Sequence, residues 1–414
     1  MLYAPGLTGH PQVYCRVIGD ILLEQGAYLI IATGQTENLN SRWPDLSPFV
    51  GRDDIEILST RSYSATGDEH LKAEELFEIQ KDRQVDSTLF IEPEHFREEF
   101  IRIFRGQAKR LRGYNAGIFG RTTEWYPGEE FHSGRKIGPF DTSLRSQLGK
   151  VRRRFSSPWT IDRYFFEKVL IKEKLLDAVI VKDERLAEQY EDKVHWLPEI
   201  YKVFNPVESG SGQREYETLK PKLDAFLSTH DPRNLVLFFG AGAWYKGYDY
   251  FIQLLVDDTK SAGIHAGAGI RKMPGKKFIG EPEKNREELL DDGRLFETNG
   301  YVESAKFIEE VFRTGPRFVS THRLTVSSGT MLQALDYGLP VLVPDTGLVG
   351  HRARTNGLGR TYRYGDSADL ARQWKSFKKE PVEQFQEAIR TFMRRFDREA
   401  VQELFIRTLI RQAV

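Results

Sequence analysis

The sequence contains one cysteine, Cys15, among its 414 residues. A single cysteine cannot form an intrachain disulfide, and it excludes the paired-cysteine spacing of zinc fingers. Long hydrophobic runs are also lacking, since no apolar stretch reaches the roughly 18 residues that a membrane-spanning helix needs. The first residues show no basic segment followed by an apolar one, so we expect no signal peptide. Together these absences predict a protein of a reducing, cytoplasmic compartment.

An excess of either charge is absent as well, because 60 Lys and Arg residues balance 60 Asp and Glu residues. We therefore expect no nucleic-acid partner. Acidic residues nevertheless predominate in 51–100 and basic ones in 101–154, most densely from Lys150 to Arg154. Two interpretations stay open for the basic stretch. It is either a solvated face paired with the acidic segment, or a patch that contacts anionic lipid at the inner membrane face or a phosphorylated acceptor.

Strand and helix patterns alternate in both halves of the sequence. Residues 28–33, 115–120 and 178–181 form apolar strand patterns in the first half, and 235–239 and 340–343 do so in the second. A strand that is apolar on both faces predicts a parallel sheet covered by helices. We therefore expect an α/β protein with two doubly wound units.

A flexible polar stretch at 208–213 separates the two patterns. We predict a first domain over 1–204, a second over 205–384, and C-terminal helices over 385–414 that pack back toward the first domain. Ligands of open α/β sheets bind at the carboxyl ends of the strands. With two such domains, the expected site is the cleft between them.

A small polar turn, Ser327 to Thr330, precedes a predicted helix that ends near Gly338. The backbone N–H groups of Ser328, Gly329 and Thr330 would lie at the positive end of the helix dipole, which suits a pyrophosphate. The alternative is an ordinary helix N-cap followed by a tight return to the next strand.

A second turn, rich in glycine, follows the predicted strand 235–239. Gly240, Gly242 and Gly247 would let a ligand approach the backbone closely, and Lys246 supplies a point charge for phosphate. The spacing fits neither a Walker loop nor a dinucleotide-binding fingerprint. The alternative is a surface loop with a solvated lysine.

Together these stretches resemble the C-terminal half of GT-B glycosyltransferases, especially the retaining family 4. Gly240 and Lys246-Gly247 match the spacing of that family's glycine and lysine-glycine pair. Gln333-Ala334 and Gly338-Leu339-Pro340-Val341 match its later signature except at a glutamate. Gly300-Tyr301-Val302 resembles the segment in which the family holds the donor base. The resemblance covers most of 235–375 well and 1–35 moderately.

The first half contributes candidates for the acceptor side. Gly9 and His10, ahead of a predicted helix, resemble the family's acceptor-side glycine loop. Arg121 and Glu124 lie just past the predicted strand 115–120, at its carboxyl end, where ligands of such sheets bind.

The sequence departs from the family pattern at its paired glutamates, which fall on Thr325 and Gln333. In the family the first touches the donor sugar and the second the ribose. Gln333 can still bond a ribose hydroxyl, whereas Thr325 cannot replace a carboxylate electrostatically. Arg323 or His322 could fill the missing role from the same loop.

The resemblance implies a GT-B architecture, in which two Rossmann-like doubly wound parallel-sheet domains face a cleft. It also implies a glycosyltransferase that moves a sugar from a nucleotide-diphosphate sugar to an acceptor hydroxyl, with retention. The expected acceptor is a glycan, a lipid-linked or a small molecule, in polysaccharide or glycoconjugate synthesis. The alternatives are a catalytically silent GT-B protein that binds or scaffolds, which the lost glutamates motivate, and a sugar-nucleotide epimerase.

Asp, Glu and His show no metal-ligand spacing, and the sequence lacks the Asp-x-Asp triplet of the other major sugar-nucleotide transferase fold. We therefore expect neither a metal nor a cofactor, with Lys246 and the helix start stabilising the leaving diphosphate. The predicted catalytic candidates are Lys246, His10, Thr325 and Arg323. The predicted donor-binding residues are Gly242, Lys246, Gly300, Val302, Ser328, Gly329, Thr330 and Gln333.

Overall fold

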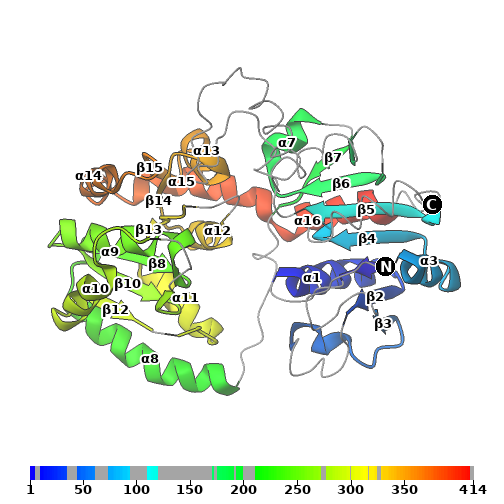
Figure 1. Cartoon of the computed structure of the whole chain (residues 1–414), viewed down its shortest axis with the longest axis horizontal. Coiled ribbons are helices and arrows are strands. Elements are labelled where there is room, and N and C mark those ends of the chain that lie inside the picture. Colours follow the sequence, from blue (N-terminus) through cyan, green and yellow to red (C-terminus); the bar gives the residue numbers. More distant parts are fainter. Residues whose placement is uncertain are drawn as a thin grey trace, which may run out of the picture. The chain divides into compact units, whose positions relative to one another are not determined.

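The computed structural model describes residues 1–4, 10–34, 44–60, 73–93, 110–119, 170–171, 175–190, 193–198, 210–271, 277–298, 300–315, 317–323 and 328–410. The chain divides into two compact units. The first comprises Met1–Phe204 and Phe396–Val414, and the second comprises Asn205–Arg395. Each unit is built on its own parallel sheet (Figure 1).

The described strands of the first unit form one sheet in the order β3-β2-β1-β4-β5-β6-β7, and every neighbouring pair is parallel. The strands are β1 (Leu2–Tyr3), β2 (Leu29–Thr33), β3 (Ile55–Ser59), β4 (Ser87–Ile91), β5 (Tyr114–Phe119), β6 (Ala178–Val181) and β7 (Val194–Trp196). The helical elements are α1 (His10–Glu24), η1 (Pro44–Phe49), α3 (Ala73–Asp82), α7 (Glu184–Gln189), α16 (Arg398–Phe405) and η10 (Ile406–Ile410).

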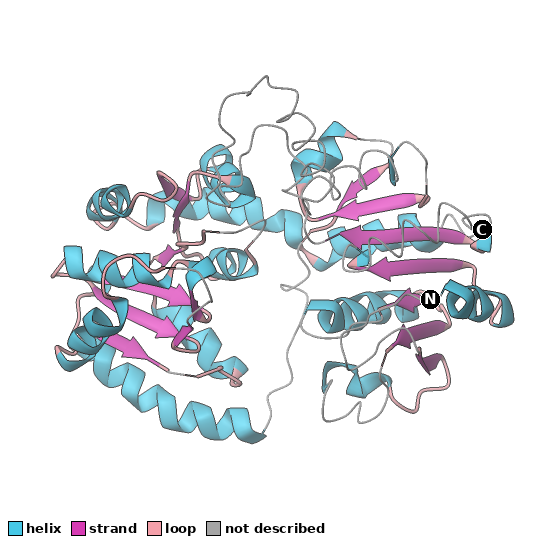
Figure 2. Cartoon of the chain, in the orientation of Figure 1, coloured by secondary structure: helices cyan, strands magenta, loops and turns pink. Residues whose placement is uncertain are grey.

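Successive residues of the first sheet face opposite layers. Leu89 and Ile91 of β4 join a buried cluster with α1 and α16, whereas Phe90 between them joins a second cluster with α3 and α7. Side chains alternate across a strand, so a strand that is apolar at every position needs helices on both faces. Figure 2 shows helices on both sides of the strands.

The described strands of the second unit form a sheet in the order β12-β10-β8-β13-β14-β15, again with parallel pairs. The strands are β8 (Leu235–Phe239), β10 (Ala262–Ala266), β12 (Leu295–Glu297), β13 (Phe318–Val319), β14 (Val341–Pro344) and β15 (Gly359–Tyr362), with a short pair of β9 (Gly242–Ala243) and β11 (Ile270–Arg271). The helical elements are α8 (Gly210–Ser228), η7 (Pro232–Asn234), η8 (Trp244–Lys246), α9 (Tyr248–Asp257), α10 (Pro282–Asp291), α11 (Ala305–Thr314), α12 (Gly329–Asp336), α13 (Gly347–Asn356), α14 (Ser367–Phe377) and α15 (Glu383–Met393). The short η9 (Arg394–Phe396) contains the point at which the chain passes from the second unit to the first.

The strand order of the second sheet reverses between β8 and β13. The chain begins at β8, moves outward to β10 and β12, and then crosses back to place β13 on the other side of β8. Connections that leave two adjacent strands in opposite directions open a crevice at their carboxyl ends. The observed sheets confirm the predicted α/β class with two doubly wound parallel units, and the reversal indicates where a ligand site of the second unit should lie.

The end of the chain returns to the first unit. Leu404 and Phe405 of α16 are buried in one cluster with Ile18 of α1. The preceding helix α15, by contrast, packs against α12 and α13 in the second unit. The return therefore begins at Phe396 and not at residue 385, where the predicted tail began, because the apolar stripe of α15 finds its partners in the second unit.

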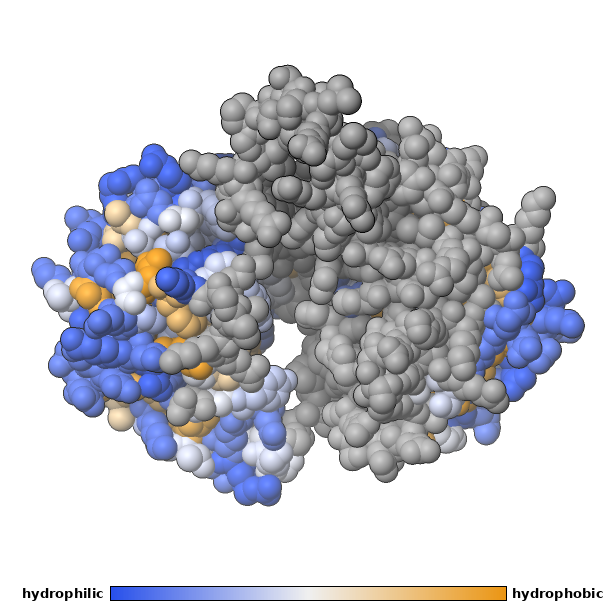
Figure 3. Space-filling view, viewed as in Figure 1, coloured by the Kyte–Doolittle hydropathy of each residue, from blue (hydrophilic) through white to orange (hydrophobic). Residues whose placement is uncertain are grey.

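The second unit presents a mostly hydrophilic face, on which hydrophobic residues are scattered (Figure 3). Among the helices that the structure describes, none combines the length and the apolar character needed to cross a membrane.

Candidate functional site

Two loops meet at the reversal point of the second sheet, one after β8 and one after β13. Thr321 Oγ1 donates hydrogen bonds to the carbonyl oxygens of Lys246 (2.9 Å) and Gly247 (2.8 Å). The backbone N–H of Arg323 donates to the carbonyl oxygen of Tyr245 at 2.8 Å. These bonds fasten the lysine turn (240–247) to the neighbouring loop.

Gly247 is the residue at which the two loops come closest. Its φ is 68°, in the left-handed region that glycine adopts at little cost. A Cβ at this position would lie 1.9 Å from the carbonyl oxygen of Thr321. Both the backbone conformation and the contact between the loops therefore require glycine here.

Arg323 forms a buried ion pair with Asp249 of α9. Its Nη1 and Nη2 atoms each lie 2.6 Å from an oxygen of that carboxylate, and Nη1 also donates to the carbonyl oxygen of Trp244 at 2.8 Å. The guanidinium packs over the Tyr250 ring, 4.3 Å from its centroid. These contacts engage the guanidinium inside the protein and tie the loop after β13 to α9, and a catalytic role for Arg323 stays a prediction.

Lys246 folds back over Gly240, the first residue after β8. A Cβ on Gly240 would lie 2.3 Å from Lys246 Nζ, so a side chain here would displace the amine from its position. The side chain is partly buried, and burial lowers the pKa of its amine. In the described part of the chain, no residue accepts a hydrogen bond from Lys246 Nζ and none forms an ion pair with it. A desolvated cation without an acceptor favours the binding of an anion.

His322 lies beside this lysine. Its Nδ1 atom is 2.7 Å from Ser320 Oγ. Burial, reinforced by the charge of Lys246, lowers the pKa of His322 to about 3. The imidazole is therefore neutral near pH 7. If the serine hydroxyl donates to Nδ1, the ring proton resides on Nε2, which makes that atom a hydrogen-bond donor.

Helix α12 begins shortly after β13 and carries four of the predicted donor-binding residues. Ser328 is its N-cap, with Oγ accepting from the N–H of Met331 at 3.1 Å. The N–H groups of Gly329 and Thr330 have no acceptor among the described residues, as is usual for the first turn of a helix. A Cβ on Gly329 would meet nothing within 4 Å. Gln333 lies one turn further and is partly exposed.

The remaining donor-side candidates are Gly242 in the lysine turn and Gly300 and Val302 after β12. A Cβ on Gly242 would lie 3.0 Å from Gly269, so this glycine allows β9 and β11 to pair. Gly300 donates its N–H to the carbonyl of Gly267 at 3.2 Å, and Val302 is buried. Tyr301 between them is 84% exposed. The loop after β12 is separated from β8 by β10, so it does not adjoin the lysine turn within the sheet.

Other predicted residues lie outside the described part of the chain: Gly9, Arg121, Glu124, Thr325 and the densest part of the basic stretch, Lys150 to Arg154. His10 begins α1, but its side chain is also outside the description. Among the residues that are described, no group of three His, Cys, Asp or Glu is arranged to hold a metal ion. Metal independence and the acceptor side stay predictions.

Sequence reasoning missed two residues that shape the site, Asp249 and Ser320. Asp249 lies in the first turn of α9, where a carboxylate is a common helix-start signal. Ser320 follows β13 directly, at the carboxyl end that the topology favours for ligands. Neither signal identifies a hydrogen-bond partner. Asp249 pairs with Arg323, which is distant in the sequence, and nothing in the sequence indicates that Ser320 bonds to His322 two residues later.

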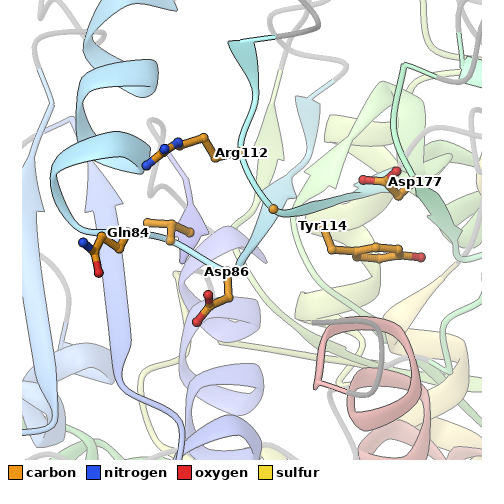
Figure 4. A pocket seen from close by; sticks show the side chains of 7 residues that line it. Gln84, Asp86, Arg112, Tyr114 and Asp177 are labelled. Atoms are coloured by element: carbon orange, nitrogen blue, oxygen red, sulfur yellow. The ribbon is translucent and has the colours of Figure 1, made fainter. Parts of the chain in front are cut away.

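Two cavities lie away from this site. One of about 630 Å³ in the first unit is lined by Gln84, Val85, Asp86, Arg112, Gly113, Tyr114 and Asp177 (Figure 4). These residues precede β4, β5 and β6, except Tyr114, which begins β5, and Arg112 and Tyr114 point in opposite directions. Another, of about 720 Å³, includes Asn234 and Arg317, which precede β8 and β13. Both cavities lie at amino ends of strands, opposite the edge where ligands of such sheets bind.

The comparisons with known proteins bear on the architecture. No protein-family model and no curated protein matches this sequence. A glycosyltransferase from Rickettsia africae ESF-5 is similar in structure, with a TM-score of 0.61 at 13% identity over 98% of this chain and 96% of that one. The chain has the GT-B fold. HepE (Alr3699) of Anabaena, solved in complex with UDP, gives a TM-score of 0.60 at 12% identity over 98% of both chains.

The same fold extends to a sucrose-phosphate synthase from Thermosynechococcus elongatus, with a TM-score of 0.58 at 12% identity over 98% of this chain and 96% of that one. The likeness therefore spans both units and confirms the GT-B architecture that the sequence resemblance implied. The closer resemblance to family 4 stays a prediction.

Proposed function

We propose that this GT-B protein is a glycosyltransferase that moves a sugar from a nucleoside-diphosphate sugar to an acceptor hydroxyl. The observation that carries the proposal is the Lys246 amine, which lies over Gly240 at the reversal point of the sheet without an acceptor among the described residues. A diphosphate supplies the missing negative charge. HepE, which shares the fold, has been solved with UDP and with UDP-glucose, and this supports a uridine nucleotide as the first donor to test.

The chemistry follows from where charge develops. The bond between the anomeric carbon of the sugar and the diphosphate oxygen breaks, and a bond to the acceptor oxygen forms. Negative charge accumulates on the leaving diphosphate. Lys246 and the N–H groups of Gly329 and Thr330, which have no acceptor among the described residues, are suited to stabilise that charge. The neutral His322, next to Lys246, would add a hydrogen bond and would not compete with the lysine for the anion.

The finer parts of the proposal come from the family resemblance. They are retention of configuration, with the donor phosphate taking the acceptor proton, and reaction without a metal or a cofactor. The acceptor class is a glycan, a lipid-linked or a small molecule in polysaccharide or glycoconjugate synthesis. A cytoplasmic protein with peripheral contact at the inner membrane face would suit a lipid-linked acceptor.

A donor panel that includes UDP-glucose tests this proposal. We expect release of free nucleoside diphosphate with at least one donor, undiminished by excess chelator, and NMR of the product should show the anomeric configuration of the donor. An absolute requirement for Mg²⁺ or Mn²⁺ would contradict the metal-free mechanism alone. Absence of both turnover and binding of nucleoside diphosphates at millimolar concentration would instead favour a catalytically silent binding protein.

A further inference from the structure

A fully buried histidine, His265 of β10, connects the core of the second unit to the lysine turn. Its relative exposure is 0%. Its Nδ1 atom lies 2.6 Å from Glu297 Oε1, at the end of β12, and its Nε2 atom lies 2.8 Å from the carbonyl oxygen of Gly240. The ring therefore links β10 to the end of β12 and to the first residue after β8. Strand β10 lies between β12 and β8 in the sheet (Figure 1).

Both atoms that face the ring are hydrogen-bond acceptors. The carbonyl of Gly240 can only accept. Glu297 also accepts from Tyr248 Oη (3.0 Å) and from Arg286 Nε (2.7 Å). Burial alone would raise the pKa of Glu297, but the hydrogen bonds from His265 and Arg286 outweigh burial and lower it to about 2. An ionised carboxylate has no proton to donate.

A neutral imidazole could satisfy only one of these two contacts, because it carries a single ring proton. The other contact would then join two lone pairs inside a buried, poorly solvated site. With both ring protons present, the imidazolium donates at 2.6 Å and 2.8 Å. Its charge lies next to the Glu297 carboxylate, which also pairs with Arg286. Tyr248 and the apolar Phe238 also pack on the ring.

The Gly240 peptide lies beneath the side-chain amine of Lys246. Its φ is 109°, its N–H donates to the carbonyl of Ala266 at 2.8 Å, and its carbonyl faces His265. A Cβ on Gly267 would lie 2.1 Å from that carbonyl. Since the Lys246 amine lies directly over the Cα of Gly240, rotation of this peptide would move the surface beneath the amine.

We propose that His265 carries both ring protons and acts as a positioning residue, which clamps the Gly240 carbonyl and so fixes the peptide beneath Lys246. His265 does not touch the donor. Its effect on diphosphate affinity rests on the proposed function, whereas its protonation state does not, so the two can be tested separately.

The protonation state is measured by ¹⁵N NMR of the histidine ring nitrogens in the full chain without ligand at neutral pH. We expect both nitrogens of His265 to be protonated, with the signals assigned by their loss in His265→Gln. In Glu297→Gln the amide N–H can donate to Nδ1, so that nitrogen should lose its proton while Nε2 keeps its bond to Gly240. A wild-type spectrum with one unprotonated His265 nitrogen would overturn the proposal.

The positioning role is measured by calorimetric titration with UDP. His265→Gln should weaken UDP binding by about tenfold, the effect of one lost charge-assisted hydrogen bond. Both N–H groups of the glutamine amide are on one nitrogen, which cannot replace two ring nitrogens that face different acceptors. The matched control is Trp374→Phe, which removes a buried N–H donor to Asp258 (3.1 Å) and Ser261 (2.8 Å) elsewhere in the same unit. Both variants should lower the Tm, but the control should bind UDP like the wild type.

Equal UDP affinity of His265→Gln and the wild type would overturn the positioning role, and so would an equal loss in the Trp374→Phe control. If the wild type binds no nucleoside diphosphate, the proposed function fails. The NMR measurement then still decides whether His265 is the doubly protonated clamp of the Gly240 peptide.

Discussion

Lys246 combines partial burial with an amine that has no acceptor among the described residues. Burial disfavours the charged form, and it lowers the pKa of this amine. A bound anion reverses that penalty, because an opposite charge within a few ångströms favours the ammonium. Affinity for an anion is therefore larger at such a lysine than at a fully solvated one.

We expect Lys246→Ala to lower kcat/KM for the nucleotide-sugar donor by roughly 100-fold, as for other preorganised groups that stabilise developing charge. The matched control is Lys260→Ala, which removes an exposed lysine near the opposite edge of the same sheet. Steady-state kinetics with circular dichroism of both variants would measure the difference. Unchanged kinetics in a folded Lys246→Ala would remove this residue from the site.

The neutral state of His322 predicts a dependence of stability on pH. Its pKa is lowered from 6.5 to about 3 in the folded protein. Between these values the unfolded chain binds a proton that the folded protein does not, so stability falls as the pH falls. As the pH falls, the free energy of unfolding of His322→Gln should decrease less than that of the wild type. The difference should be at most about 1.4 kcal/mol per pH unit. Urea titrations at pH 7 and pH 5 measure this, and parallel losses in both proteins would contradict it.

At the scale of elements, the lysine turn was predictable and its partners were not. The sequence from Gly240 to Gly247 contains the glycines and the lysine of the turn, because turn chemistry is local. The contact with Thr321 depends on β8 and β13 being neighbours. That adjacency arises from a crossover, because β10 and β12 of the same sheet lie between β8 and β13 along the chain, and no local pattern encodes it.

The junction of the two loops can be tested with a pair of glycines. Gly247 and Gly293 have nearly the same φ, 68° and 67°, but a Cβ on Gly293 would meet nothing within 4 Å. Gly293→Ala should therefore cost only the backbone strain of roughly 1–2 kcal/mol. Gly247→Ala adds a clash with the Thr321 carbonyl, and we expect about 1–3 kcal/mol more. Free energies of unfolding from urea titrations provide the comparison, and equal losses would mean that the loops separate without cost.

For the whole molecule, the two-unit organisation was visible in the sequence, but the partner of each C-terminal helix was not. The helices α15 and α16 both carry apolar stripes. A stripe indicates that one face is buried, without naming the surface that covers it. In the structure α15 packs in the second unit and α16 in the first. The unit against which each helix packs depends on the apolar surface that the rest of that unit leaves uncovered.

The assignment of the last residues to the first unit gives a prediction for the whole chain. Phe405 of α16 and Phe377 of α14 are both fully buried, the former in a cluster with α1 and the latter against Trp374 and Phe385. Each change to alanine should cost about 3–5 kcal/mol in the unit that holds the ring.

Hydrogen exchange read by mass spectrometry should separate the two variants. Phe405→Ala removes packing from α1, so peptides of α1 and β4 should exchange faster while those of α12 and β14 stay protected, because local opening follows the cooperative unit that lost stability. Phe377→Ala should produce the converse pattern. If Phe405→Ala accelerated exchange in the second unit and left α1 unchanged, the C-terminal segment would belong to the second unit, and the division at Phe396 would be wrong.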